Sequence, residues 1–469
     1  MKNECPAEKK CGGCTNLHVS YEEQLKQKQE AVQKLYPKYH VDPVLGMKNP
    51  YHYRHKVYAA FGTDRNGRLM AGMYEEHTHR IVPSGSCLIQ NETANQILKG
   101  MIEIAEELHL SAYDEDTRRG ILRHAYIRVA HSTGKAMAVI VIGSEELPGA
   151  KKFVSLLTNR FPEIETIVLN FNRKHTSMVL GERSKVLYGP GYLTDELLGM
   201  KFHISPASFY QVNPVQTEVL YQTAIDLAGI TDHDAVLDAC CGIGTISLIA
   251  ARQAKEVVGV EISPDAIRDA QHNAKLNHIT NADFYCDDAN SFLDRLIDRP
   301  DVVILDPPRA GMKQVFMQHL AEMKPDRVVY ISCFPETQAR DIKNLTCRGY
   351  LVKKIVPVDL FPMTDHVETV VQLSKGNISS EKVRVEFSLE DMDMSRFQQG
   401  ATYEQIQDWV KEKYGFHVTH LNIAKTKRKC GIIERQNYNL PKSEGSRSPE
   451  TPREKEKAII EAFRHFGMI

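Results

Sequence analysis

Short apolar runs alternate with amphipathic stretches along residues 225–375 of the chain. Each run is about as long as one buried strand, and helix-length segments such as SPDAIRDAQHNAKLNH separate the runs. Strands that alternate with helices in this way are typical of a doubly wound, mostly parallel sheet, so the sequence predicts an α/β, Rossmann-like fold here. The predicted strands are AVLDACCG, EVVGVEI, DVVILDPP, RVVYISC and VETVVQL.

Changes in this pattern along the chain predict four domains. Residues 1–92 combine a cysteine cluster, a helical stretch and β-rich sequence, whereas residues 93–200 alternate helices with strands in an α+β pattern. The doubly wound region follows at 201–376. A polar break, SKGNISSEKVR, then leads into a separate extension at 377–469.

The C-terminal extension is predicted to form a helix, a turn at Gly415 and a second helix with basic side chains. A helix-turn-helix-like module of this kind is typical of nucleic-acid-binding proteins, although a solvated basic face accounts for the same charges. Its basic run carries Lys425, Lys427, Arg428, Lys429 and Arg435 against Glu434.

The composition is that of a globular protein with no overall excess of charge. Hydrophobic residues make up 42% of the chain, and 59 Lys and Arg residues nearly balance 60 Asp and Glu residues. Any surface for nucleic acid must therefore be local. No apolar run reaches the roughly 18 residues that span a bilayer, and the N-terminus lacks the apolar core of a secretory signal. We therefore predict a cytoplasmic monomer without a membrane segment.

One stretch, VLDACCGIGTISLIAA, combines a strand, a glycine turn and the start of a helix. Gly242 and Gly244 would let a ligand approach the backbone, but the third glycine of a dinucleotide fingerprint is missing. The next strand ends at Glu261, whose carboxylate suits the hydroxyls of a ribose. Asp306 ends a later strand before a rigid Pro-Pro turn, and Arg309 follows that turn. Each feature alone also fits a structural turn, but together they favour S-adenosylmethionine (SAM) over NAD.

Cys333 lies at the carboxyl end of the strand RVVYISC, where ligands bind in open α/β sheets. Most free cysteines only fill space in a core, but a helix predicted to follow Cys333 would lower the pKa of its thiol. A thiolate that adds to C6 of uracil makes C5 nucleophilic enough to take a methyl group. A base must then remove the C5 proton. Glu368 is the candidate, with Asp365 and His366 as competitors.

In their order along the chain, five segments resemble motifs of the bacterial SAM-dependent RNA 5-methyluridine methyltransferases. The segments are SFYQVNP, CGIGTISL, LDPPRAG, ISCFPETQARD and DHVETVVQL. The resemblance implies that Cys333 is the nucleophile and Glu368 the base. It implies that Gln211, Cys240, Glu261 and Asp306 contact SAM, and that Phe209 and Arg309 lie near an extruded uracil.

This sequence departs from the family pattern at two positions. The family usually has Tyr or Phe where Cys240 stands, so an aromatic contact to the cofactor is missing or replaced. It usually has Asn after the nucleophile, where this chain has Phe334, so the local hydrogen bonding must differ. Neither change removes the implied nucleophile, base or ribose ligand.

Three cysteines gather near the N-terminus in the pattern C-x5-C-x2-C, and Cys87 stands alone. Four thiolates hold either zinc or an iron–sulfur cluster, and spacing does not decide between them. The ribosomal-RNA branch of the family carries a four-iron cluster on this pattern, and the transfer-RNA branch lacks it. The resemblance therefore implies a [4Fe-4S] cluster on Cys5, Cys11, Cys14 and Cys87.

A stacked base cannot reach a thiolate and a methyl donor together, so the RNA must present an extruded or looped nucleotide. Three basic-aromatic segments are candidate RNA contacts, although such segments are often ordinary strand faces: YHYRHKVY at 51–58, GILRHAYIRV at 120–129 and FNRKH at 171–175. We therefore expect an RNA uracil-C5 methyltransferase that acts on 23S ribosomal RNA. The alternatives are a transfer-RNA uracil-C5 methyltransferase, an RNA cytosine-C5 methyltransferase and a non-catalytic nucleic-acid-binding protein.

Overall fold

A computed structural model gives the fold of the chain. It describes residues 5–8, 10–75, 78, 80–176, 178–296, 299–376, 401–430, 451–466 and 468. The chain divides into two compact units, Met1–Ser379 and Ser380–Ile469, and each is described by itself.

A seven-stranded sheet with the order β12-β11-β10-β13-β14-β16-β15 forms the doubly wound region. The strands are β10 (Ala235–Asp238), β11 (Glu256–Glu261), β12 (Ala282–Cys286), β13 (Val302–Leu305), β14 (Arg327–Ser332), β15 (Tyr350–Val358) and β16 (Glu368–Lys375). The first five strands of that order are parallel, whereas β16 runs antiparallel to both of its neighbours. The predicted α/β, Rossmann-like fold is therefore confirmed.

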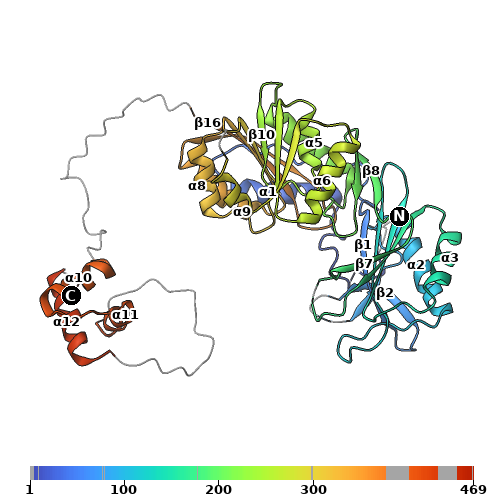
Figure 1. Ribbon diagram of the computed structural model, residues 1–469, viewed down its shortest axis with the longest axis horizontal. Helices are drawn as coiled ribbons and strands as arrows, with labels where there is room; N and C mark the ends of the chain where they lie inside the picture. Colours follow the sequence, from blue (N-terminus) through green and yellow to red (C-terminus); the bar gives the residue numbers. More distant parts are fainter. Residues whose placement is uncertain are drawn as a thin grey trace. The chain divides into compact units, whose positions relative to one another are not determined.

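Helices cover both faces of this sheet because its central strands are apolar on both sides. Val236, for example, joins a core with α4 (Pro214–Ala228), α5 (Thr245–Ala251) and α6 (Pro264–Leu276). Its neighbour Leu237 joins the opposite core with α1, α7, α8 and α9. These helices are α1 (Tyr21–Leu35), α7 (Ala289–Leu293), α8 (Gln314–Met323) and α9 (Pro335–Thr346). Figure 1 shows α5 and α6 on one side of the sheet and α8 and α9 on the other.

A second seven-stranded sheet, with the order β3-β2-β1-β4-β5-β6-β7, lies in the same unit. Its strands are β1 (Lys56–Thr63), β2 (Leu69–Tyr74), β3 (Ile81–Pro83), β4 (Leu122–Val129), β5 (Ala136–Ile142), β6 (Ile164–Phe171) and β7 (Arg183–Tyr188). One face packs on α2 (Glu92–Glu107) and α3 (Ala150–Arg160) (Figure 1). Strands from both sides of residue 92 share this sheet, so the first two predicted domains have a common core. A hairpin of β8 (Leu193–Leu197) and β9 (Met200–Ile204) then leads to α4.

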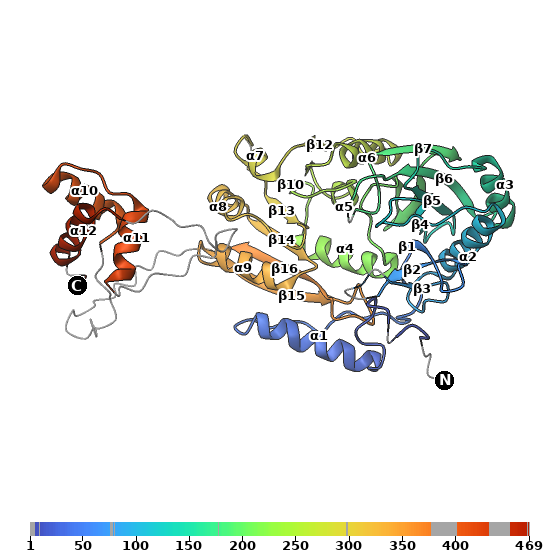
Figure 2. The same cartoon turned by 90° about the horizontal axis from the view of Figure 1, so that it is seen from below.

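The N-terminal segment packs against the loop that precedes β16. The ammonium of Lys28 on α1 donates to Asp359 at 2.6 Å, and both side chains are buried. The backbone amides of Thr15 and Asn16 donate to the carbonyl of Met363. Helix α1 therefore belongs to the doubly wound sheet rather than to the sheet that follows it in sequence, and it lies beside α9 (Figure 2).

The Ser380–Ile469 unit contains three helices within its described residues, α10 (Tyr403–Tyr414), α11 (His420–Lys429) and α12 (Arg453–His465). Ile406, Ile423 and Phe463, one from each helix, meet in its core. Helix α10 ends at Gly415, which has a φ of 72°. Arg435 and Glu434 of the predicted basic run lie outside the described residues. Across the described part of the chain, every helix is too short or too polar to cross a membrane.

Candidate functional site

The acidic and thiol candidates gather at one edge of the doubly wound sheet. The chain leaves β10 toward β11 on one side and later returns to β13 on the other side, so a crevice forms where these directions diverge. The strand ends at this edge carry Asp238 on β10, Glu261 on β11, Asp306 after β13, Cys333 after β14 and Glu368 at the start of β16.

The glycine turn lies directly beside Glu261. Gly242 and Gly244 have φ values of 55° and 81°, which side chains with a Cβ rarely adopt. The backbone amide of Gly242 donates to Oε2 of Glu261 at 3.3 Å, and the amide of Ser263 donates to Oε1 at 2.9 Å. Since a carboxylate has about four acceptor sites, Glu261 can still accept hydrogen bonds from a ribose.

Buried carboxyls surround the centre of this edge. Burial raises the pKa of Asp238 to about 6, although a hydrogen bond from Ser247 opposes the shift. Burial, and then the charge of Asp238, raise the pKa of Asp306 to about 7. Burial, and then the charge of Asp306, raise the pKa of Glu368 well above its usual range. A cation placed among these groups would favour their ionised forms.

The unpaired atoms of the site fit a polar, cationic ligand. Oδ1 of Asp238 and Oε2 of Glu368 are buried without a hydrogen-bond partner among the described residues. A buried acceptor without a donor destabilises a fold unless a ligand or ordered water satisfies it. SAM carries ammonium, hydroxyl and sulfonium groups, so the residues at this edge are chemically suited to it.

Cys333 directly follows β14, and Glu368 opens the neighbouring strand β16. Ser332 pairs with Thr369 in the antiparallel ladder of β14 and β16, and Cys333 and Glu368 are the next residues in that register. Helix α9 begins at Pro335, as predicted, but it does not leave the thiol acidic. Burial, and then the charges of Glu368 and Asp306, raise the pKa of Cys333 to about 11. The expected lowering of the pKa of Cys333 is therefore wrong.

Of the three candidates for the base, Glu368 alone is buried, at 2% exposure. Asp365 accepts a hydrogen bond from Asn16 at 2.6 Å. His366 is exposed, and the pKa of its ring is lowered by partial loss of solvent contact and then by the charge of Arg309. Glu368 is thus the buried candidate, and its charge raises the pKa of the Cys333 thiol.

The remaining candidates lie around this centre. Burial, and then the charges of Asp238 and Asp306, raise the pKa of the Cys240 thiol. Cys240 therefore lies near the same carboxyls. Phe334 lies under Arg309, whose guanidinium carbon is 5.1 Å from the ring centroid, so the residue after Cys333 holds a cation. The charge of Arg309 in turn opposes the rise in the pKa of Cys333.

The loop before α4 carries the candidates from the motif SFYQVNP. Phe209 is 62% exposed, which leaves its ring free to contact a ligand. Gln211 lies near enough to Tyr221 to lower the pKa of its hydroxyl, whereas burial and then the charge of Asp306 raise that pKa. This loop therefore reaches from the protein surface to the centre of the site.

The four N-terminal candidate cysteines line a single cavity of about 110 Å³. Burial, and then the charges of Cys87, Cys11 and Cys5, raise the pKa of Cys14 to about 12. The thiolates therefore repel one another, and a cationic group bound between them would relieve that repulsion. No group of three or more Cys, His, Asp or Glu residues in the described ranges is arranged to hold a metal ion. The four cysteines therefore share a cavity without being arranged as a metal-ion site in the described residues.

Two features of the site are absent from the sequence predictions. Asp238 is fully buried next to Asp306, and its position at the end of a strand before the glycine turn is the signal that could have identified it. The contacts of Thr15 and Asn16 with Met363 join segments far apart in the sequence, and no local pattern indicates them.

Comparisons with known proteins agree with this chemistry. The tRNA (uracil-5-)-methyltransferase family model matches residues 182–376. An uncharacterized RNA methyltransferase of Halalkalibacterium halodurans is 43% identical over 382 residues, which cover 80% of this chain and 83% of that protein. An uncharacterized RNA methyltransferase of Listeria innocua is 43% identical over 378 residues, covering 79% of this chain and 83% of that protein.

A solved structure also resembles this chain over most of its length. It is the tRNA (uracil-54, C5)-methyltransferase of Pyrococcus abyssi in complex with S-adenosyl-L-homocysteine. The two share 27% sequence identity and a TM-score of 0.66, over 77% of this chain and 86% of the other.

Proposed function

This chain belongs to the family of SAM-dependent RNA (uracil-5-)-methyltransferases, and on that premise we propose that it methylates C5 of uridine in 23S ribosomal RNA. We assign Cys333 as the nucleophile and Glu368 as the general base. The observation that carries this assignment is their proximity at the adjoining ends of β14 and β16, beside the buried Asp306. We also infer that the enzyme acts as a cytoplasmic monomer.

The reaction requires Cys333 to lose its proton before it attacks. Burial and nearby carboxyls raise the pKa of this thiol to about 11, and the charge of Arg309 opposes that rise. The thiol proton passes to water as the substrate binds. The thiolate sulfur then bonds to C6 of the uracil, and the electron pair of the C5–C6 double bond becomes available at C5.

Glu368 completes the reaction after C5 has gained its methyl group. Its carboxylate accepts the C5 proton, the C5–C6 double bond re-forms, and the C6–sulfur bond breaks to release Cys333 as a thiolate. The burial of Glu368 holds the carboxyl next to the reacting carbon and keeps bulk water away from it. The product is 5-methyluridine, and the proton leaves by way of Glu368.

The cofactor residues assigned from the sequence fit SAM at this edge. Glu261 would bind the ribose hydroxyls, while Asp306, Gln211 and Cys240 would border the rest of the molecule, with the turn at Gly242 and Gly244 beside it. Bound SAM supplies the methyl group and a positive charge that favours ionised Asp306 and Glu368. Phe209 and Arg309 are assigned to the extruded uracil and its surroundings.

The N-terminal cysteines support ribosomal RNA as the target. Cys5, Cys11, Cys14 and Cys87 would hold a [4Fe-4S] cluster, which is supported by their sharing one cavity, and zinc is the alternative. The group would fasten the N-terminal segment to the protein. Iron and acid-labile sulfide in the protein purified without oxygen test this assignment, and one zinc per chain without iron would replace it.

Transfer RNA is the second candidate substrate. It is favoured by the likeness to a solved enzyme whose name specifies uracil 54 of tRNA. Mass mapping of 5-methyluridine in ribosomal and transfer RNA, from cells with and without the gene, decides between the two. We expect one or more 5-methyluridines of 23S RNA to disappear without the gene. Loss confined to tRNA would establish the second candidate, and no loss in either RNA would refute both.

We assign the Ser380–Ile469 unit to RNA binding as a helix-turn-helix-like module. Helix α10, the turn at Gly415 and the lysine-bearing helix α11 support this assignment. Lys425→Glu in the full chain should weaken binding of a labelled ribosomal RNA fragment. Unchanged binding by the folded variant would argue against it.

A further inference from the structure

Two of the three basic-aromatic segments become neighbouring strands in the fold. Strand β1 pairs antiparallel with β4, so that Lys56 lies opposite Arg128 and Tyr58 lies opposite Tyr126. Because alternate residues of a strand face the same side, these four side chains share one face of the sheet. The intervening Val57 joins the core under α2 and α3 on the opposite face.

The third basic-aromatic segment has its charges neutralised. Arg173 pairs with Glu145 at 2.5 Å, and Lys174 pairs with Glu182 at 2.6 Å. By contrast, within the part of the chain that the structure describes, no Asp or Glu forms an ion pair with Lys56 or Arg128. Burial, and then the charge of Arg128, lower the pKa of Lys56 to about 7, so an anion next to Lys56 would favour its charged form.

Arg128 is a buried cation whose donors are only partly used. Arg128 is 3% exposed, and its Nη2 donates to the carbonyl of Ser208 at 3.1 Å. Nε and Nη1 have no hydrogen-bond partner among the residues that the structure describes. The rings of Tyr126 and Tyr210, 5.6 and 5.9 Å away, offset part of the charge but supply no anion. A buried cation without an anion is costly, so an anionic ligand would stabilise this arrangement.

This charged face adjoins the loop that leads into the methyltransferase site. The Lys56 ammonium lies 5.4 Å from the centroid of the exposed Phe209 ring and 5.8 Å from that of Tyr58. Phe209 follows Ser208, which Arg128 holds, and precedes Gln211 by two residues. An RNA whose uracil enters the site past Phe209 would therefore bring its backbone next to Lys56.

We propose that Lys56 and Arg128 form a binding site for an RNA phosphate next to the target uridine, with Phe209 and Tyr58 as the adjoining aromatic surface. Lys56 contacts the phosphate directly, and Arg128 supplies the buried positive charge beneath it and fixes the loop at Ser208. This assignment rests on the proposed function only in taking RNA as the substrate. It adds a positioning site outside the residues that perform the chemistry. Lys56 and Tyr58 also line the cavity of the four N-terminal cysteines, so the phosphate site borders that cavity.

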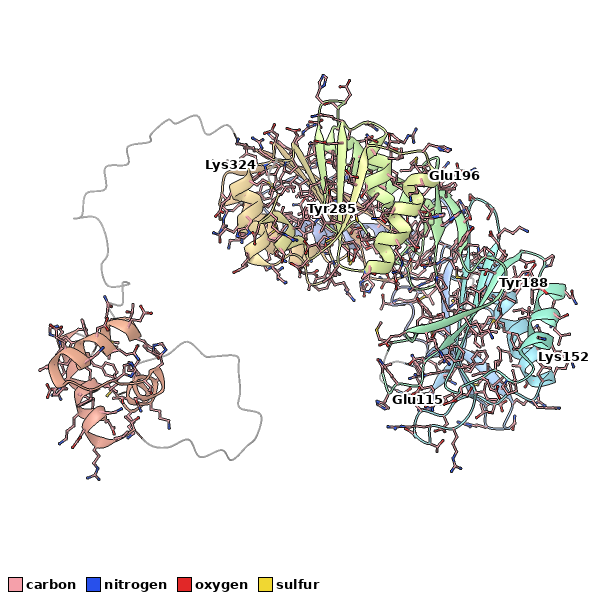
Figure 3. All side chains as sticks on the ribbon, viewed as in Figure 1. Glu115, Lys152, Tyr188, Glu196, Tyr285 and Lys324 are labelled. Carbon is pink, nitrogen blue, oxygen red and sulfur yellow. The ribbon has the colours of Figure 1, made fainter. Side chains whose placement is uncertain are left out.

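Lys56→Met tests the proposal, because it removes the ammonium and keeps a side chain of similar length. The matched control is Lys152→Met, since Lys152 lies on α3 against the other face of the same sheet (Figure 3). Affinity for fluorescein-labelled oligouridine is measured by anisotropy between about 50 and 200 mM salt. We expect Lys56→Met to weaken binding about tenfold and to reduce the salt slope by about 0.7, with no change for Lys152→Met. Wild-type affinity and slope in Lys56→Met would overturn the proposal.

Two further measurements distinguish a phosphate site from a site that recognises a base. On oligouridine with neutral methylphosphonate linkages, wild type and Lys56→Met should bind equally, whereas a persistent difference would mean that Lys56 recognises a base. Arg128→Met, with folding checked by circular dichroism, should weaken binding to normal oligouridine at least tenfold, and Arg128→Lys should restore most of it. A folded Arg128→Met variant with wild-type affinity would remove Arg128 from the site.

These binding measurements are independent of methylation. If the wild type binds in this salt-dependent way yet forms no 5-methyluridine, the proposed function fails and the phosphate site stands.

Discussion

Replacing Lys28 by Met should destabilise the Met1–Ser379 unit, because the buried ammonium pairs with Asp359 and also donates to the carbonyl of Phe361 at 3.0 Å. The Lys28 ammonium lies 2.6 Å from Oδ1 of Asp359, with the two side chains 3% and 0% exposed. At an effective dielectric constant of about 20, unit charges at this separation attract by about 6 kcal/mol. Part of this attraction is offset because burial of Lys28 is itself unfavourable and lowers the pKa of its ammonium.

The net loss should therefore be about 3–5 kcal/mol, the range for removing one partner of a buried ion pair. After the change, the carboxylate of Asp359 would keep the hydrogen bond from the Tyr21 hydroxyl at 2.8 Å but would lose its cation. Asp359→Asn should relieve this penalty in the Lys28→Met background. The double variant should thus be more stable than the two single losses predict, by about 2–3 kcal/mol.

Urea unfolding followed by far-UV circular dichroism measures these differences. The single tryptophan, Trp409, provides an internal control because it belongs to the Ser380–Ile469 unit. The circular dichroism transition should move to lower urea in Lys28→Met, while the Trp409 fluorescence transition should stay in place. A loss below about 1 kcal/mol, or single losses that simply add in the double variant, would refute the reasoning.

Two further predictions concern the thiol and the glycine turn. The pKa of Cys333 is about 11, so its alkylation by iodoacetamide should be about 100-fold faster at pH 9 than at pH 7. Peptide mass spectrometry follows the reaction, and a rate that reaches a plateau below pH 9 would contradict the raised pKa. Gly244 has a φ of 81°, and a Cβ there would lie 3.0 Å from the ring of Phe284, so Gly244→Ala should lower stability by about 1–3 kcal/mol and weaken SAM binding. Gly67→Ala is the control, because its φ is 77° and nothing lies within 4 Å; an equal loss there would mean that the contact with Phe284 contributes nothing.

The doubly wound sheet could be predicted from the sequence because its strands are short, apolar on both faces and separated by helices. The same argument brings Glu261, Asp306 and Cys333 to one edge, since parallel strands carry their carboxyl ends together. The roles of these residues stay predictions until variants are measured.

Features that depend on long-range packing could not be predicted in this way. The pairing of Lys28 with Asp359 joins positions 331 residues apart. The antiparallel register of β1 and β4 unites two basic-aromatic segments that look like ordinary strand faces when taken singly. The raised pKa of Cys333 follows from burial and from nearby carboxyls, and these outweigh the helix that the sequence indicates.

The central claim is that Cys333 forms a covalent bond to uracil C6 and that Glu368 allows its release. Glu368→Gln keeps the size of the side chain but cannot accept the C5 proton, so it tests both roles in one measurement. After incubation with SAM and ribosomal RNA, we expect a complex that survives denaturing electrophoresis, with a methylated uridine attached to Cys333 in peptide mass spectrometry. Free turnover by Glu368→Gln, or an adduct on a different cysteine, would contradict the account.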